Sequence, residues 1–98
     1  MKIVYAGTPE FAVAPLRALL QAGYAVVGVV TQEDKPQGRK GILTPSPVKR
    51  YAVERGLPVV TPKKIRDELS TLKEFQADLM VTCAYGQILT QGVIDVFP

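Results

Sequence analysis

Four short apolar runs, separated by stretches with helical spacing, constrain the fold of this chain more than any other feature. The runs are residues 2–6, 25–31, 57–60 and 78–84, and three of them are rich in valine or isoleucine. Strands that alternate with helices form a parallel sheet with right-handed crossovers. The run AVVGVVT at 25–31 is nearly all apolar, as is typical of a strand covered on both faces. The sequence therefore predicts an α/β fold with an open parallel sheet of about four strands and helices on both faces.

Prolines and glycines mark where the intervening helices begin and end. Thr8 and Pro9 resemble an N-cap and a first helical residue, but Pro15 indicates that this helix is broken or begins near Ala14. Ser46 and Pro47 predict the start of a second helix. Two further helices are expected, one after Thr61 and Pro62 with Ile65, Leu69 and Leu72 facing inward, and one over residues 87–97.

Composition limits both the class of protein and its chemistry. The 98 residues suit one domain or part of one, and 47% are hydrophobic, which argues against disorder. No apolar run reaches the ~18 residues needed to cross a bilayer, and the apolar stretch after Met1 is too short for a signal peptide. The lone Cys83 indicates a reducing, cytoplasmic setting, and we interpret it as strand filling rather than as a nucleophile. With no histidine, the chain offers no triad, metal site or carboxylate pair, so we expect no metal and no catalytic centre.

Residues 32–50 form the one long stretch without helical or strand periodicity. They carry five basic residues against two acidic ones, which equals the entire net charge of +3. A loop this long inside a small domain is usually functional or disordered. We therefore expect either contacts to phosphates or a solvated loop, with residues 34–43 mobile in the absence of a ligand. Base stacking from within the loop is not expected, because no aromatic residue lies between Thr31 and Arg50.

Ligands of open α/β sheets bind beyond the carboxyl ends of the strands, where three segments meet. One is GTPEF at 7–11, which is either a structural turn or a turn that faces a ligand. The second is the loop at 32–50. The third is AYGQIL at 84–89, which either lines a flat apolar slot or packs into the core. None of them is a dinucleotide fingerprint or a Walker loop.

Three longer motifs resemble those of the methionyl-tRNA formyltransferase family. They are MKIVYAGTPEFAV at the start, VVTQEDKPQGRKGILTPSPVK in the middle and ADLMVTCAYGQIL near the end. They follow the order and spacing of that family and together cover essentially the whole chain. The resemblance implies a Rossmann-like catalytic domain that moves a formyl group from 10-formyltetrahydrofolate to the amine of methionine on initiator tRNA.

The resemblance also implies roles for particular residues. The long loop of the family reaches the acceptor stem of the tRNA, and Arg39, Lys40 and Lys49 match its basic positions. Gly41 and Ile42 stand where lysines are common. The remaining matches are a folate-binding set and the rim of the active site: Tyr85, Gly86, Gln87, Ile88 and Leu89 for folate, and Gly7, Thr8, Pro9 and Phe11 for the rim.

Motifs expected further along such an enzyme are not in this sequence. The Asn-x-His strand and the Ser-Leu-Leu-Pro turn, which carry the catalytic groups of the family, do not occur here. We therefore expect residues 1–98 to be the N-terminal part of the catalytic domain, without its remainder and without the C-terminal tRNA-binding domain. The expected partners are initiator methionyl-tRNA and folate, with no membrane, and the full-length protein is expected to be a monomer. This piece alone is expected to be inactive.

Two alternatives remain open at this stage. The first is another folate-dependent formyltransferase with a sugar-nucleotide or metabolite acceptor, against which the TPSPVK motif argues. The second is a non-catalytic module that binds RNA or a nucleotide. The basic loop permits the second alternative, but the missing glycine fingerprint does not favour its nucleotide form.

Overall fold

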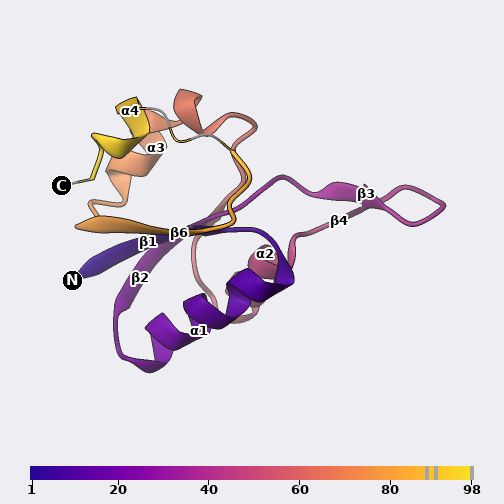
Figure 1. The fold of residues 1–98 in the computed structure, drawn as a ribbon, viewed down its shortest axis with the longest axis horizontal. Helices are drawn as coiled ribbons and strands as arrows, with labels where there is room; N and C mark the ends of the chain where they lie inside the picture. Colours follow the sequence, from indigo (N-terminus) through magenta and orange to yellow (C-terminus); the bar gives the residue numbers. More distant parts are fainter. Residues whose placement is uncertain (88, 90, 98) are drawn as a thin grey trace.

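The main sheet has four parallel strands in the order β5-β2-β1-β6 (Figure 1). This computed structural model describes residues 1–87, 89 and 91–97. The strands are β1 (Lys2–Gly7), β2 (Ala25–Val30), β5 (Val59–Val60) and β6 (Leu79–Cys83). Each overlaps one of the four predicted runs, so the α/β class and the parallel sheet are confirmed.

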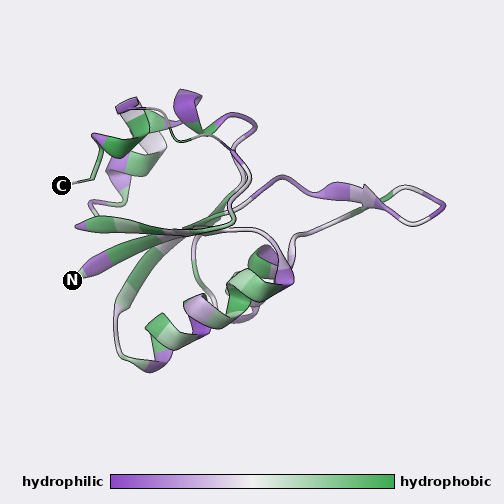
Figure 2. Ribbon diagram, viewed as in Figure 1, coloured by the Kyte–Doolittle hydropathy of each residue, from purple (hydrophilic) through white to green (hydrophobic). Residues whose placement is uncertain are grey.

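Helices cover both faces of this sheet (Figure 1). The helices α1 (Val13–Gln21) and α2 (Pro47–Glu54) lie on one face, and α3 (Leu69–Glu74) and α4 (Gln91–Ile94) lie on the other. Two short 3-10 helices, η1 (Glu10–Ala12) and η2 (Ile65–Asp67), precede α1 and α3. Colouring by hydropathy shows the apolar residues concentrated in the strands and on the helices beside them (Figure 2).

Strand β1 supplies residues to the hydrophobic core on both faces. Successive side chains of a strand point to opposite faces. Tyr5 accordingly packs with Leu16 of α1 and Val48 of α2, while Val4 and Ala6 belong to the cluster on the α3 side. Every residue from the second position of β1 to its end is buried, as a central strand of a two-sided sheet requires.

An irregularity in β2 keeps its side chains in register with both cores. Ile3 pairs with Val26 but Val4 pairs with Gly28, so β2 holds one extra residue at this point. Val26 and Val29, three positions apart, therefore reach the same cluster. Gly28 faces the ring of Phe75, and a Cβ there would lie 2.5 Å from Phe75 Cε1, so a larger side chain would overpack the core.

The first helix does not start as the Thr8–Pro9 pair predicted. Pro9 precedes η1 without any side-chain cap, and the Thr8 hydroxyl is used elsewhere. The helix α1 begins at Val13, which places Pro15 in the first turn, where its missing N–H leaves no bond unmade. The alternative start near Ala14 was therefore the better prediction.

The second helix begins as predicted. Ser46 is its N-cap and accepts a hydrogen bond from the Lys49 N–H at 3.0 Å, with Pro47 as the first helical residue. The segment after Pro62 forms η2 and the short α3 rather than one helix, although Ile65 and Leu72 are buried as expected.

The final helix predicted over 87–97 is represented by α4 alone, and residues 88, 90 and 98 lie outside the described part.

The segment predicted to be irregular contains a β-hairpin, so that prediction was wrong for its middle. Strands β3 (Lys35–Gln37) and β4 (Ile42–Thr44) pair antiparallel, and the hairpin projects away from the sheet (Figure 1). Gly38 and Gly41 have φ values of +73° and +59°, which let the chain reverse between the strands. No alternation of polar and apolar residues marked these strands, because both of their faces are exposed to solvent.

Among the described residues, no helix combines the length and the hydropathy that crossing a bilayer would need.

We predict that the hairpin exchanges its amide hydrogens much faster than the sheet. Residues 35–43 are all exposed, so only the short β3–β4 ladder protects their amides. Hydrogen exchange followed by mass spectrometry is expected to label residues 37–43 within seconds while β1 stays protected. Protection of the hairpin equal to that of β1 would contradict this prediction.

Candidate functional site

Three segments meet at the carboxyl edge of the sheet, as the parallel topology requires. Because β2, β1 and β6 are neighbours, the turn after β1, the base of the hairpin and the segment after β6 lie side by side. We call this edge the rim. Hydrogen bonds between the three segments, described below, confirm that they are in contact.

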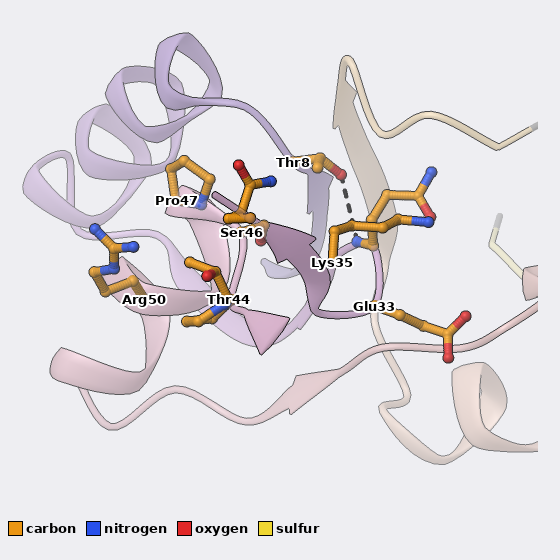
Figure 3. A pocket seen from close by; sticks show the side chains of 10 residues that line it. Thr8, Glu33, Lys35, Thr44, Ser46, Pro47 and Arg50 are labelled. Atoms are coloured by element: carbon orange, nitrogen blue, oxygen red, sulfur yellow. Dashed lines mark hydrogen bonds between the residues drawn. The ribbon is translucent and has the colours of Figure 1, made fainter. Parts of the chain in front are cut away.

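A cleft of about 440 Å³ opens at the rim between the turn after β1, the hairpin and the start of α2 (Figure 3). Lys35 and Arg50 approach it from opposite sides, and Glu33 is the one acidic residue that the described part of the chain contributes to its wall. The remaining lining combines five polar side chains with two prolines, so the cleft offers hydrogen-bonding groups and apolar surface beside its two cations. The lining residues are Thr8, Gln32, Glu33, Lys35, Gln37, Thr44, Pro45, Ser46, Pro47 and Arg50.

Two side-chain pairs fix the base of the hairpin. The hydroxyls of Thr31 and Ser46 share a hydrogen bond of 2.6 Å, and both residues are buried. Removing either hydroxyl would leave its partner without that bond in the protein interior, at a cost of about 1–3 kcal/mol. The Lys49 ammonium donates to the Asp34 carboxylate at 2.8 Å, with 29% and 32% of these side chains exposed. An ion pair so accessible to water contributes about 1 kcal/mol at most, so it orients the hairpin more than it stabilises it.

The structure separates the three predicted tRNA-binding residues. Arg39 and Lys40 lie in the exposed turn at the tip of the hairpin, whereas Lys49 lies in the first turn of α2 beside the base. Lys49 forms an ion pair with Asp34, while no carboxylate among the described residues pairs with Arg39 or Lys40. The role of all three in binding tRNA stays a prediction.

The turn after β1 is shaped by close packing around Gly7. A Cβ at Gly7 would lie 2.9 Å from Tyr5 Cε2 and 3.0 Å from the Cys83 carbonyl oxygen, so any side chain there would overlap its neighbours. The Tyr5 hydroxyl donates to the Ala12 carbonyl oxygen at 2.5 Å and ties η1 to the sheet. These contacts explain on packing grounds why position 7 is a glycine.

The other predicted rim residues of this turn differ in exposure. The Thr8 hydroxyl donates to the Tyr85 carbonyl oxygen at 2.6 Å and lines the cleft, while Pro9 is partly exposed. Phe11 leaves 67% of its surface in solvent, unusual for so large an apolar side chain. Its exposure identifies a surface that a ligand or another part of the protein can cover.

In the segment after β6, the Tyr85 ring packs in the core rather than lining an open slot. It is 4% exposed and belongs to the cluster that holds Val4 and Val93. Its hydroxyl has no hydrogen-bond partner among the described residues, and burial raises the pKa of this phenol to about 12. Of the two interpretations of this segment, core packing is therefore correct for the Tyr85 ring. Leu89 packs partly against the same cluster, and Ile88 lies outside the described residues.

Gln87 uses its side chain within the protein. Its Oε1 accepts from the Ile65 N–H at 2.8 Å, and its Nε2 donates to the Pro62 carbonyl oxygen at 3.1 Å. Gly86 has a φ of +102°, a conformation that L side chains rarely adopt. Folate binding by this segment stays a prediction, and Gly86 is the exposed one among the described residues that it assigns to folate.

The residues that the sequence analysis did not single out are those that join the rim segments. Gln32, Thr44 and Gln37 line the cleft, and Lys35 and Arg50 were counted only as charges. Gln32 carried one usable signal, since it lies two residues after the end of β2, at the carboxyl edge of the sheet. The others depend on how the hairpin is placed beside the start of α2, which no local pattern showed. No group of three or more cysteine or acidic residues that could hold a metal ion occurs within the described ranges.

We predict that Tyr85→Phe leaves the protein as stable as before or stabilises it by about 1 kcal/mol at neutral pH, because it removes a buried hydroxyl without a partner. The folded-state pKa of about 12 lies above the ordinary value of 10.0, so burial favours the neutral phenol. The stability that this raised pKa contributes is fully present below pH 10 and is lost as the pH rises through about 12. The variant is therefore expected to lose less stability than the wild type over this range, as measured by urea unfolding.

Tyr24→Phe is the matched control, because Tyr24 is 47% exposed, and it is expected to change neither quantity. A clear destabilisation by Tyr85→Phe at neutral pH would mean that the hydroxyl has a partner after all.

Comparison with known proteins identifies the family. A family profile described as "Formyl transferase" matches residues 1–98. The methionyl-tRNA formyltransferase of Symbiobacterium thermophilum is 55% identical over 100% of this chain and 31% of its own length. Those of Bacillus licheniformis and Bacillus subtilis are 51% and 50% identical over 96% of the chain and 30% of their own lengths. The chain thus spans about a third of each relative. Since the family profile covers every residue, the chain belongs to the formyl transferase family.

Proposed function

We propose that this chain is the N-terminal part of the catalytic domain of a methionyl-tRNA formyltransferase. In this proposal the enzyme transfers the formyl group of 10-formyltetrahydrofolate to the amine of initiator methionyl-tRNA during translation initiation. The observation that carries it is the identity of at least 50% to three such enzymes over at least 96% of the chain. The rest of the catalytic domain and a C-terminal tRNA-binding domain would follow these 98 residues, and we place the enzyme in the cytoplasm as a monomer.

On the acceptor side, we assign the hairpin and the cleft to tRNA. Arg39 and Lys40 would contact backbone phosphates from the exposed tip, since cations on a glycine-rich turn suit such contacts. Lys35 and Arg50 would extend these contacts into the cleft. Lys49 would add a weaker contact, because Asp34 already shares its charge.

On the donor side, we assign the segment after β6 to folate. Gly86 leaves its backbone open to a flat ring system, and Tyr85, Gln87, Ile88 and Leu89 complete the segment. Gln87 would act there by holding the backbone of this segment, since its own side chain is bonded to residues 62–65. Gly7, Thr8, Pro9 and Phe11 would form the wall between the donor and the acceptor.

Within these residues we assign no catalytic group. Formyl transfer requires a deprotonated amine and a polarised formyl carbonyl. The sequence contains no histidine, and the described rim side chains that form hydrogen bonds are amides, hydroxyls and the ion-paired Lys49 and Asp34. We infer that the chain positions both substrates and that groups elsewhere in the enzyme perform the proton transfer.

We predict that the full-length protein formylates initiator methionyl-tRNA in the presence of 10-formyltetrahydrofolate and leaves an amino-sugar nucleotide and glycinamide ribonucleotide unmodified. The 98-residue chain alone is expected to transfer no formyl group to any of the three. Mass spectrometry of each acceptor measures both results. Formylation of the sugar nucleotide would favour the alternative acceptor class, and activity of the isolated chain would overturn the assignment of catalysis to later residues.

We predict that Arg39→Ala combined with Lys40→Ala weakens binding of the full-length protein to initiator methionyl-tRNA. The loss of two phosphate contacts is expected to lower the slope of log affinity against log salt by about 2. Titrations from low to moderate salt measure this slope.

The matched control is Arg66→Ala combined with Lys73→Ala, which removes the same charges from exposed positions in η2 and α3, away from the hairpin. If both double variants lowered the slope equally, the effect would come from the net charge of the protein rather than from the position of the residues. That result would contradict the assignment of the hairpin tip.

A further inference from the structure

Gln32 occupies the junction between all three segments of the rim. It follows Thr31, the first residue after β2, and leads into the hairpin. Its backbone N–H donates to the Thr8 hydroxyl at 3.4 Å, the bond drawn in Figure 3. The same hydroxyl donates to the Tyr85 carbonyl oxygen at 2.6 Å. Thr8 therefore bridges the base of the hairpin to the segment after β6.

The side chain of Gln32 reaches that segment directly. Its carboxamide occupies the space beside Gly86, where an added Cβ would overlap Gln32 Nε2 and lie 3.4 Å from Cδ. Its Oε1 accepts a hydrogen bond from Gln87 Nε2 at 3.4 Å. Because of these contacts, a shift of Gly86 toward Gln32 displaces the Gln32 side chain.

Gln87 makes the far side of this contact rigid. Its carboxamide is bonded to the Ile65 N–H and to the Pro62 carbonyl oxygen, so the segment 85–87 is tied to the buried start of η2. A displacement at Gly86 is therefore passed to Gln32 more readily than it is absorbed by its own segment. Gln32 in turn lies only two residues before Asp34, which holds the hairpin through Lys49.

We infer that Gln32 is a positioning residue that couples the segment 84–87 to the base of the hairpin. The inference rests on the proposed function, in which this segment meets the formyl donor and the hairpin meets the tRNA. A donor that orders residues 85–87 would hold Gln32 in place and thereby the direction of the hairpin. The two substrates would then be aligned through one carboxamide rather than through contact with each other.

A test without ligand compares two glycine variants of the full-length protein. Gly86→Ala and Gly23→Ala introduce a similar backbone strain, since the φ values are +102° and +86°, but at Gly23 no described residue other than its chain neighbours lies within 4 Å of an added Cβ. We expect hydrogen exchange in residues 32–44 to become about five-fold faster in Gly86→Ala only, the factor at the low end of measured couplings between sites. Adding Gln32→Ala to Gly86→Ala is expected to remove the overlap and most of this effect. Equal exchange of the hairpin in the two glycine variants would overturn the inference.

A second pair of variants keeps the test decisive if Gly86→Ala does not fold. Gln32→Ala removes the carboxamide at the junction, and Gln37→Ala removes the same group from another wall of the same cleft. The probe is 5-formyltetrahydrofolate, with its binding measured separately by calorimetry. It is expected to slow exchange in residues 32–44 of the wild type and of Gln37→Ala about five-fold, and to leave Gln32→Ala unchanged.

The outcomes separate this inference from the proposed function. Slowing that persists in Gln32→Ala, or bound folate without slowing in the wild type, would overturn the coupling and leave the proposed activity intact. Absence of folate binding by the wild type would overturn the assignment of the donor. In that case the glycine variants still decide whether Gln32 joins the two segments.

Discussion

The pairing of β1 with parallel neighbours on both sides is the constraint on which the rest of the structure depends. Residues 3–7 are buried, with Tyr5 in the core under α1 and α2 and its neighbours Val4 and Ala6 in the core under α3 and α4. Because β2, β1 and β6 all run in the same direction, their carboxyl ends meet at one edge. This edge gathers the turn at Gly7, the hairpin and the segment after β6, and so creates the rim at which we place the function.

The hairpin shows how a small sheet can support a long projection without a core of its own. Its strands are exposed on both faces, so burial of apolar surface contributes little to its stability. Its base is held instead by the buried hydroxyl pair of Thr31 and Ser46 and by the ion pair of Asp34 and Lys49. These contacts at the base fix the direction in which the hairpin projects, while Arg39 and Lys40 stay exposed at its tip.

The elements with strong periodicity were predicted correctly, and those that depend on distant contacts were not. The four strands and the capped start of α2 follow from local patterns, namely apolar runs and a serine before a proline. Thr8 was misassigned as a helix cap because its hydroxyl bonds to Tyr85, 77 residues away. The sequence likewise carried no sign that the Gln87 side chain bonds to the backbone of residues 62–65, which only the folded chain brings beside it. Polar side chains can satisfy a local or a remote partner, and the sequence does not say which.

The sequence by itself determined the class of the fold, the family and the concentration of positive charge in residues 32–50. Those properties reside in apolar periodicity, motif spacing and net charge, which need no knowledge of contacts. Only the tertiary structure decided that the charged segment is a hairpin, that Lys49 is paired, that the Tyr85 ring is buried and that Gln32 fills the space beside Gly86. Each of these depends on which residues of separate segments come within a few ångströms of one another, and that is fixed by how the strands pack in three dimensions.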